Sequence, residues 1–353
     1  RRFRRKHKQR WILLASLIVL LVIASSTLGV TLLTQKSTAI SSGSGQAIFF
    51  SNQHTPGGRT NALNITIHNL ETPSAGYEYE AWIINDQTEE VTDLGRLTEK
   101  SQTWSLTYSR ANSNLLAVGD KIEVTLEQGV VKAPAGKVIL ASTFPVKAFS
   151  HIQHILVSFP QTPGKIGFLT GVLEQTHLLN IQASVLQSVA TSRNTIAIEC
   201  VTQSMLDIIE GTHGTHYRPL AGTCNQQNVT VTGDGFGLLG KGYLTDAEEH
   251  ASLALSMPDA TSAMRQHAAL MDIALSNITT WVTTIEQDIL HLHANPTDLA
   301  SIQEITTLTD DAYHGIDVNG DGQIDPVVGE AGALSAYQQG QLMATLFLAP
   351  VNS

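Results

Sequence analysis

Two different hydrophobic periods divide the chain. Between residues 47 and 148, apolar and polar side chains alternate, as in the segment Leu63–His68. Alternation with period two is typical of strands that bury one face. The pattern predicts about seven short strands separated by Gly, Pro and Asn turns, including segments at 63–67, 77–84, 102–108, 122–126 and 137–141. Short strands at this spacing favour an antiparallel β-sandwich over residues 47–148.

After Phe149 the apolar positions recur every three to four residues, the period of an amphipathic α-helix. This spacing predicts helices at about 166–190, 194–210, 259–293, 298–314 and 332–348. Helices joined by short loops predict an all-α bundle over residues 149–353. The expected fold is thus multi-domain, with the β-sandwich followed by the helical bundle.

The segment before the strands has a different character. Residues 1–10 hold seven Arg and Lys side chains, and the stretch from Trp11 to Leu33 carries no charge. Such a stretch is long enough to cross a bilayer as a helix, and the preceding cations favour a cytoplasmic N-terminus. We expect a single-pass membrane protein, with 34–46 as a flexible linker and the rest outside the cytoplasm. A cleaved signal peptide ending near Ser26 is the alternative.

Charge narrows the range of partners. The net charge is −10, and residues 151–353 hold five basic against twenty acidic side chains, a net charge of −15. Nucleic-acid binding depends mainly on cations that contact phosphates, so an acidic body argues against it. We expect a protein or small-ligand partner outside the cell.

Four short motifs in the strand-rich region follow one another in the order seen in a known family. They are Tyr79–Trp82, Leu94–Gly95, Val124–Glu127 and Pro134–Gly136. Together they resemble the extracytoplasmic C-terminal domain of anti-sigma-K factors (RskA type). The resemblance implies a β-sandwich sensor domain. Only ten residues precede the apolar stretch, so a sigma factor is not expected to bind this chain directly.

An Asp- and Gly-rich segment near the C-terminus predicts a calcium site. Side chains with oxygen atoms recur at loop positions 1, 3, 5 and 9, and Gly322 stands at position 6, as in an EF-hand-like loop. Position 12 is Val328, and the acid arrives two residues later. The predicted Ca²⁺ ligands are Asp317, Asn319, Asp321, Gln323, Asp325 and Glu330.

Histidine is the second candidate ligand. Ten of the thirteen histidines lie between residues 151 and 314, including the pairs His151/His154 and His213/His216. Clustered imidazoles can bind transition metals or haem. A di-iron centre built from Glu174/His177 and Glu210/His213 is disfavoured, because Glu174 points away from the apolar face of its helix. His267, at the centre of an apolar stripe, favours a core role.

The remaining motifs say less about function. Cys200 and Cys224 are the only cysteines, and in an exported domain they can pair. The segment Gly235–Gly240 fits G-x-G-x-x-G but lacks the βαβ context of a dinucleotide site. We find no motif of nucleophilic catalysis and expect no enzyme.

These observations favour a membrane-anchored extracytoplasmic sensing or binding protein with a calcium-stabilised helical domain. The alternative is an exported metal- or haem-binding helical bundle with a redox or metal-handling role.

Overall fold

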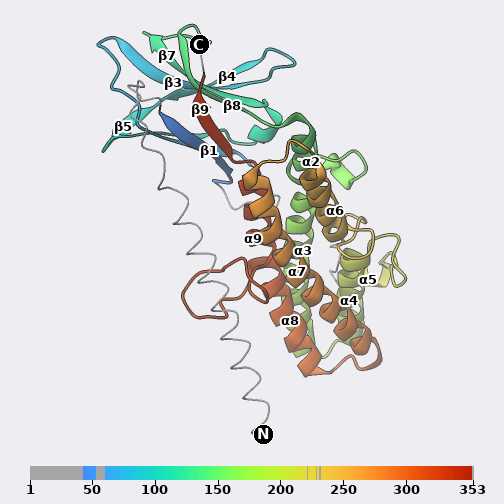
Figure 1. Cartoon of the computed structure of the whole chain (residues 1–353). Coiled ribbons are helices and arrows are strands. Elements are labelled where there is room, and N and C mark those ends of the chain that lie inside the picture. The colour runs from blue at the N-terminus through green and yellow to red at the C-terminus, as the bar shows by residue number, and fades with distance from the viewer. Residues whose placement is uncertain (1–42, 53–59, 221, 228, 230–231, 352–353) are drawn as a thin grey trace. The chain divides into compact units, whose positions relative to one another are not determined.

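The computed structural model describes residues 43–52, 60–220, 222–227, 229 and 232–351 (Figure 1). The strands are β1 (Ser44–Phe50), β2 (Ala62–His68), β3 (Tyr77–Ile84), β4 (Val91–Arg96), β5 (Thr98–Lys100), β6 (Thr103–Ser109), β7 (Lys121–Gln128), β8 (Lys137–Thr143) and β9 (Leu346–Pro350). The α-helices are α2 (Val146–Leu156), α3 (Phe168–Thr191), α4 (Thr195–Glu210), α5 (Gly222–Gln226), α6 (Tyr243–Ser256), α7 (Ser262–Ala294), α8 (Leu299–His314) and α9 (Ala333–Met343).

All nine strands form one antiparallel sheet in the order β4-β3-β7-β8-β9-β1-β2-β6-β5. The two edge strands, β4 and β5, follow each other in the chain with only Leu97 between them. The sheet must therefore curl until its edges approach, and β4 also contacts β6. The result is a nearly closed barrel.

The expected β-sandwich is wrong. The strands before residue 144 do form two groups of four, β4-β3-β7-β8 and β1-β2-β6-β5, but β9 pairs with both β8 and β1 and joins them. Period-two alternation shows only that one face of each strand is buried, which holds for a barrel as well as for a sandwich. The joining strand comes from the C-terminus, where we expected one helix over 332–348 and the structure has α9 followed by β9.

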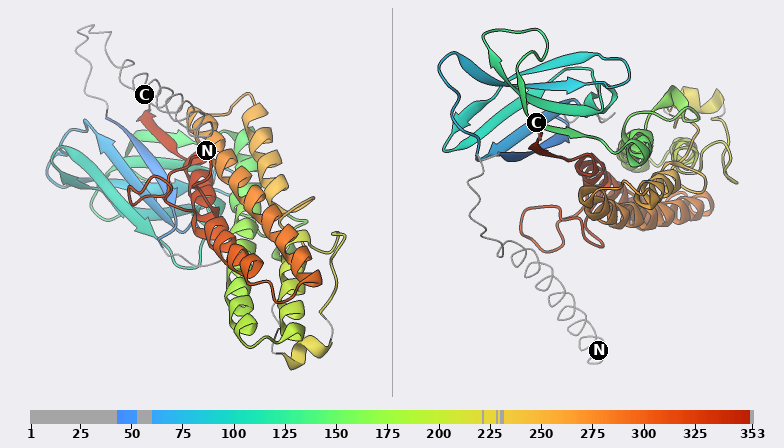
Figure 2. Two further views of the ribbon diagram at one scale, coloured as in Figure 1. Left: turned by 90° about the horizontal axis from the view of Figure 1, so that it is seen from below. Right: turned by 45° about the horizontal axis from the view of Figure 1, so that its top comes forward.

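The sheet lies at one end of the helices (Figures 1 and 2). The two parts share one core. One continuous cluster of buried apolar side chains runs from the strands into the helices. Phe144 marks the transition, since its ring contacts Phe49 of β1 and stacks on Phe149 of α2 at 3.8 Å. Gln341 of α9 donates to the hydroxyl oxygens of Ser51 and Thr60, a polar tie beside this core.

Helices α3, α4, α7 and α8 lie close to the predicted ranges, whereas α2, α5 and α6 were not predicted. Helix α7 spans 33 residues and contacts α4, α6, α8 and α9. Side chains cap the N-termini of three helices: Thr261 accepts from Met264 N–H, Asn194 from Ala197 N–H and Asp298 from Ala300 N–H. Each cap satisfies a backbone donor that has no partner within the helix.

The expected transmembrane helix finds no counterpart in the described part of the chain. No helix there combines the length and the apolar character required to cross a bilayer. The stretch Trp11–Leu33 lies outside the described residues.

Candidate metal centre

Three histidine side chains converge between two helices. His151 and His154 are three residues apart on α2, so they lie on the same face of that helix. His250 reaches them from α6, and its Nδ1 lies 3.3 Å from Nδ1 of both partners. One nitrogen from each ring lies within 4.8 Å of the others. His250 thus adds a third candidate ligand to the pair His151/His154.

The approach of α2 to α6 has an identifiable cause. Helix α2 begins after Pro145 and has no side-chain cap of its own. Asp259, in the turn between α6 and α7, supplies that cap, because its carboxylate accepts from Lys147 N–H at 2.8 Å and Ala148 N–H at 3.1 Å. A carboxylate at a helix N-terminus also interacts favourably with the helix dipole. The turn after α6 therefore ties the start of α2 to α6.

Aromatic rings surround the histidines on one side. Phe159 packs edge-on against His154 at 5.0 Å, and Phe168, which is fully buried, lies 4.9 Å from His250. These apolar neighbours remove water from the rings. Burial, and then the two neighbouring histidines, lower the pKa of His250 to about 4, and burial lowers the pKa of His154. Both rings are therefore neutral near pH 7, the form that binds metals.

The distances fit a bound ion better than a pair of hydrogen bonds. An imidazole Nδ1 has a single in-plane site, either a proton or a lone pair. Nδ1 of His250 faces two other Nδ1 atoms at 3.3 Å, so it can form a good hydrogen bond with only one of them. Tetrahedral Zn²⁺ with Zn–N bonds of about 2.05 Å would separate its nitrogen ligands by about 3.3 Å.

The predicted calcium loop has an ordered backbone. The carboxylate of Asp317 accepts from the N–H groups of Gly320, Asp321 and Gly322 at 2.6 to 3.2 Å. Asn319 lies 3.5 Å from the carboxylate of Asp325, which brings loop positions 3 and 9 together. The turns thus have the compactness that an EF-hand-like loop needs.

The end of the loop differs from an ordinary EF-hand. Val328 at position 12 is exposed, whereas Glu330 is only 2% exposed and accepts from Asp325 N–H at 2.9 Å. Asn277 of α7 holds this end through bonds to Val327, Gly329 and Ala331. Among the described residues, groups of three His, Cys, Asp or Glu ligand atoms within 4.8 Å occur at two places, and the loop is not one of them. Calcium binding at the loop, including the carbonyl ligand of Gln323, stays a prediction.

The histidines of the other His motif line one cavity of about 430 Å³. His216 also contacts Glu210, the last residue of α4. Glu210 does not meet Glu174 but Glu286 of α7. His177 packs on Tyr313 at 4.9 Å, and His267 shares a hydrogen bond of 2.8 Å with Gln339.

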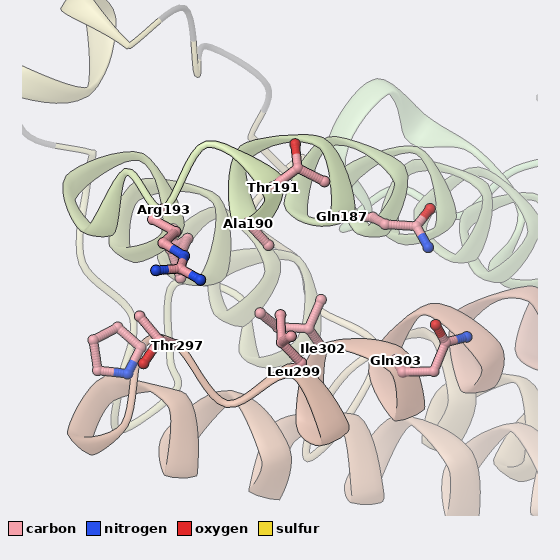
Figure 3. A pocket seen from close by; sticks show the side chains of 10 residues that line it. Gln187, Ala190, Thr191, Arg193, Thr297, Leu299, Ile302 and Gln303 are labelled. Carbon is pink, nitrogen blue, oxygen red and sulfur yellow. The ribbon is translucent and has the colours of Figure 1, made fainter.

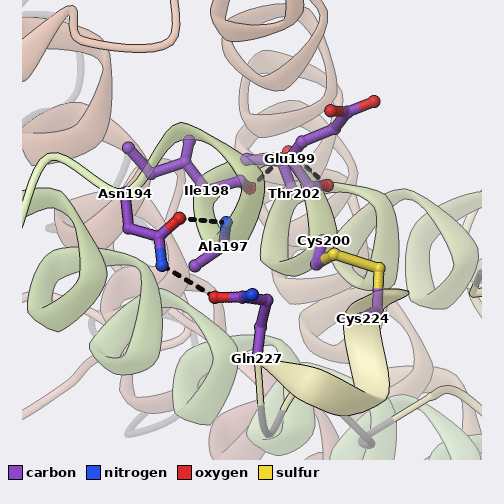
Figure 4. Close-up of a disulfide and its surroundings, with 8 residues drawn as sticks. All are labelled: Asn194, Ala197, Ile198, Glu199, Cys200, Thr202, Cys224 and Gln227. Carbon is purple, nitrogen blue, oxygen red and sulfur yellow. Dashed lines mark hydrogen bonds between the residues drawn. A yellow bond between two sulfur atoms is a disulfide. The ribbon is translucent and has the colours of Figure 1, made fainter. Parts of the chain in front are cut away.

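The two cysteines form a disulfide, an option that the sequence left open (Figure 4). Cys200 lies in α4 and Cys224 in the short α5, with Cα atoms 5.5 Å apart and a sequence separation of 24. Both are nearly fully buried. Disulfides of this kind persist in oxidising compartments.

A larger cavity, of about 670 Å³, lies elsewhere, between the end of α3, the start of α4 and the start of α8 (Figure 3). Ala190, Ile198, Leu299 and Ile302 give it apolar walls, and Arg193 is the charged residue among those that line it. It contains no histidine or carboxylate that could bind a metal.

Comparison with known proteins adds no relative. No family model matches the sequence, and neither the curated proteins nor the solved structures contain a match. The resemblance to anti-sigma-K factors therefore stays a prediction. Neither the fold nor any comparison points to an enzyme.

His250 and Glu286 were not predicted from the sequence as candidate ligands. No helix was expected over Tyr243–Ser256, although Leu244, Ala247, Ala251 and Ala254 are all buried there. That small apolar stripe was the available signal. The sequence held no comparable signal for Glu286. This residue of α7 contacts Glu210 of α4, and the two are far apart in the chain.

Proposed function

We propose that this protein binds a transition-metal ion outside the cytoplasm, with His151, His154 and His250 as its protein ligands. The observation that carries the proposal is the convergence of three Nδ1 atoms, two of them 3.3 Å from the third. The disulfide supports a location outside the cytoplasm, because cytosolic reductants keep such thiols reduced.

The chemistry of the donors selects the class of ion. Three neutral imidazoles suit Zn²⁺, Cu²⁺, Ni²⁺ or Fe²⁺, whereas Ca²⁺ and Mg²⁺ require oxygen ligands. Zn²⁺ is the best probe, because tetrahedral coordination agrees with the two Nδ1–Nδ1 distances of 3.3 Å.

The number of ligands favours reversible binding. Structural zinc sites are closed by four protein ligands, while three ligands leave one position for water or another molecule. All three histidines are partly exposed, so solvent can reach the site. The helices around it pack on a continuous apolar core. We therefore assign a metal-handling role.

The test is the amount of Zn²⁺ that the purified full chain retains after dialysis, measured by mass spectrometry and by calorimetric titration. The unmodified protein should bind one more ion per chain than His250→Ala. The matched control is His68→Ala, which removes an exposed histidine of β2 and should change nothing. Equal stoichiometry in the unmodified protein and His250→Ala would refute the proposal.

Calcium at the loop is a second, separate role. The specific support is the compact backbone around Asp317 together with the burial of Glu330, which ends the loop beside α7. A bound Ca²⁺ would neutralise the carboxylates of a short loop and stabilise α8 and α9 on either side.

A further inference from the structure

A second cluster of ligand atoms lies at the end of α4. Nδ1 of His216 is 2.5 Å from Oε1 of Glu210, and the backbone N–H of His216 donates to Oε2 of the same carboxylate at 2.6 Å. Glu286 of α7 completes the group, with one ligand atom of each residue within 4.8 Å of the others. This cluster shares no residue with the three-histidine site.

Two glycine contacts show that the chain is shaped around Glu210. A Cβ at Gly214 would lie 2.1 Å from Cβ of Glu210 and 2.3 Å from its Oε2, so only glycine lets the loop pass over this side chain. A Cβ at Gly237, whose φ is +85°, would lie 2.7 Å from the carbonyl of Glu210. The Gly-rich segment 235–240, which looked like a dinucleotide motif, therefore packs against the end of α4 and helps to fix Glu210.

Two carboxyl side chains and one imidazole meet at this place. The side chain of Glu210 is 7% exposed, and a side-chain hydrogen bond joins it to Glu286. The ring of His216 is the ion-pair partner of Glu210 on the other side. A divalent ion between these groups would contact both carboxylates and the imidazole at once.

The surroundings leave room for the rest of a coordination shell. The cluster borders a cavity of about 430 Å³, lined also by His213, Thr215 and Lys241. Water molecules or an anionic group next to Lys241 could fill the open positions of an ion held by three protein ligands.

We propose that Glu210, His216 and Glu286 form a second metal site, which takes a divalent first-row ion through two carboxylates and one imidazole. This donor set accepts Mn²⁺, which the all-nitrogen site of His151, His154 and His250 does not favour. The two sites would thus differ in the ions they select.

Binding of Mn²⁺ can be followed by electron paramagnetic resonance of the free ion. The full chain carries Asp321→Ala throughout, so that the predicted calcium loop does not contribute. In this background we expect one Mn²⁺ per chain, and His216→Ala should weaken binding at least tenfold. The matched control is His213→Ala, which removes the neighbouring histidine of the same loop and cavity and should leave affinity within twofold.

A second variant tests the carboxylates. Glu286→Gln keeps a hydrogen bond to Glu210, because its amide N–H donates to that carboxylate, but it removes one carboxylate ligand. We expect at least a tenfold loss of Mn²⁺ affinity with the circular dichroism spectrum unchanged, and no loss for Glu248→Gln of α6. Absence of bound Mn²⁺ in the parent, or equal affinities of His216→Ala and His213→Ala, would overturn the proposal. Neither result would bear on the three-histidine site. That site is tested separately, by the Zn²⁺ stoichiometry of the unmodified protein and of His250→Ala.

Discussion

Asn277 offers the sharpest test of how the helices hold the predicted calcium loop. This residue of α7 is 6% exposed. Its amide donates to the carbonyls of Val327 at 2.9 Å and Ala331 at 3.2 Å, and its oxygen accepts from Gly329 N–H at 2.8 Å. One side chain thus ties three backbone groups at the end of the loop to the longest helix.

The cost of Asn277→Ala follows from these contacts. Each buried hydrogen bond contributes about 1 kcal/mol, and the backbone groups left behind lose their partners in an enclosed place, which adds to the loss. Alanine regains about 0.5 kcal/mol of helix propensity. We therefore expect the free energy of unfolding to fall by about 2–4 kcal/mol.

The assay is urea unfolding followed by circular dichroism at 222 nm, with midpoints compared at equal slope. Asn277→Asp keeps the size but removes both donors, and it should lose nearly as much stability as the alanine variant. The matched control is Asn180→Ala of α3, whose single bond to Asp310 is long, at 3.3 Å, and exposed. If Asn277→Ala and Asn180→Ala unfold at the same midpoint, the three bonds do not stabilise the loop as argued.

Four further predictions follow from charge, cross-linking and metal. Burial depresses the pKa of His250 from 6.5 to about 4, so the metal-free protein should lose stability as the pH falls through this range, and His250→Leu should flatten that slope in urea titrations at several pH values. Burial and then Glu210 raise the pKa of Glu286 from 4.5 to about 7; stability should therefore fall as the pH rises through that interval, and Glu286→Gln should gain more at pH 8 than at pH 5. Replacing both Cys200 and Cys224 by Ser opens a loop with a sequence separation of 24 and should cost about 3.5 kcal/mol by urea unfolding, while the unmodified protein should show no free thiol until it is denatured and reduced. Millimolar Ca²⁺ should raise the melting temperature relative to chelator, and Asp321→Ala should abolish the difference; equal melting curves of the unmodified protein in both conditions would contradict the loop prediction.

Local patterns were sufficient for much of the secondary structure. The alternation over 77–84 corresponds to β3, Tyr77–Ile84, and the helical period over 194–210 corresponds to α4, Thr195–Glu210. The spacing of apolar side chains predicted the type and bounds of these elements. It did not predict that both are buried on more than one face, as β3 is from Tyr79 to Ile83. The sequence also indicated which cysteines could pair, because Cys200 and Cys224 are the only two and lie close in the chain.

The closure of the sheet depended on tertiary structure. Strand β9 contributes five residues after the last helix, and a short apolar run there is compatible with either a helix end or a strand. Its pairing with β8 and β1 becomes visible only when the helices have brought the C-terminus back to the sheet. Without it, two groups of four strands look like the halves of a sandwich.

The candidate metal sites, too, could be predicted only in part from the sequence. The spacing of His151 and His154 could be read directly, because residues three apart share a helix face. The third ligand, His250, comes from a helix nearly a hundred positions later, and Glu210 meets Glu286 only because α4 packs on α7. Periodicity describes the faces of one element at a time, whereas a metal site requires side chains from several elements at one point. The sequence by itself determined which faces are buried, and the packing of α2 on α6 and of α4 on α7 decided which histidines and carboxylates meet.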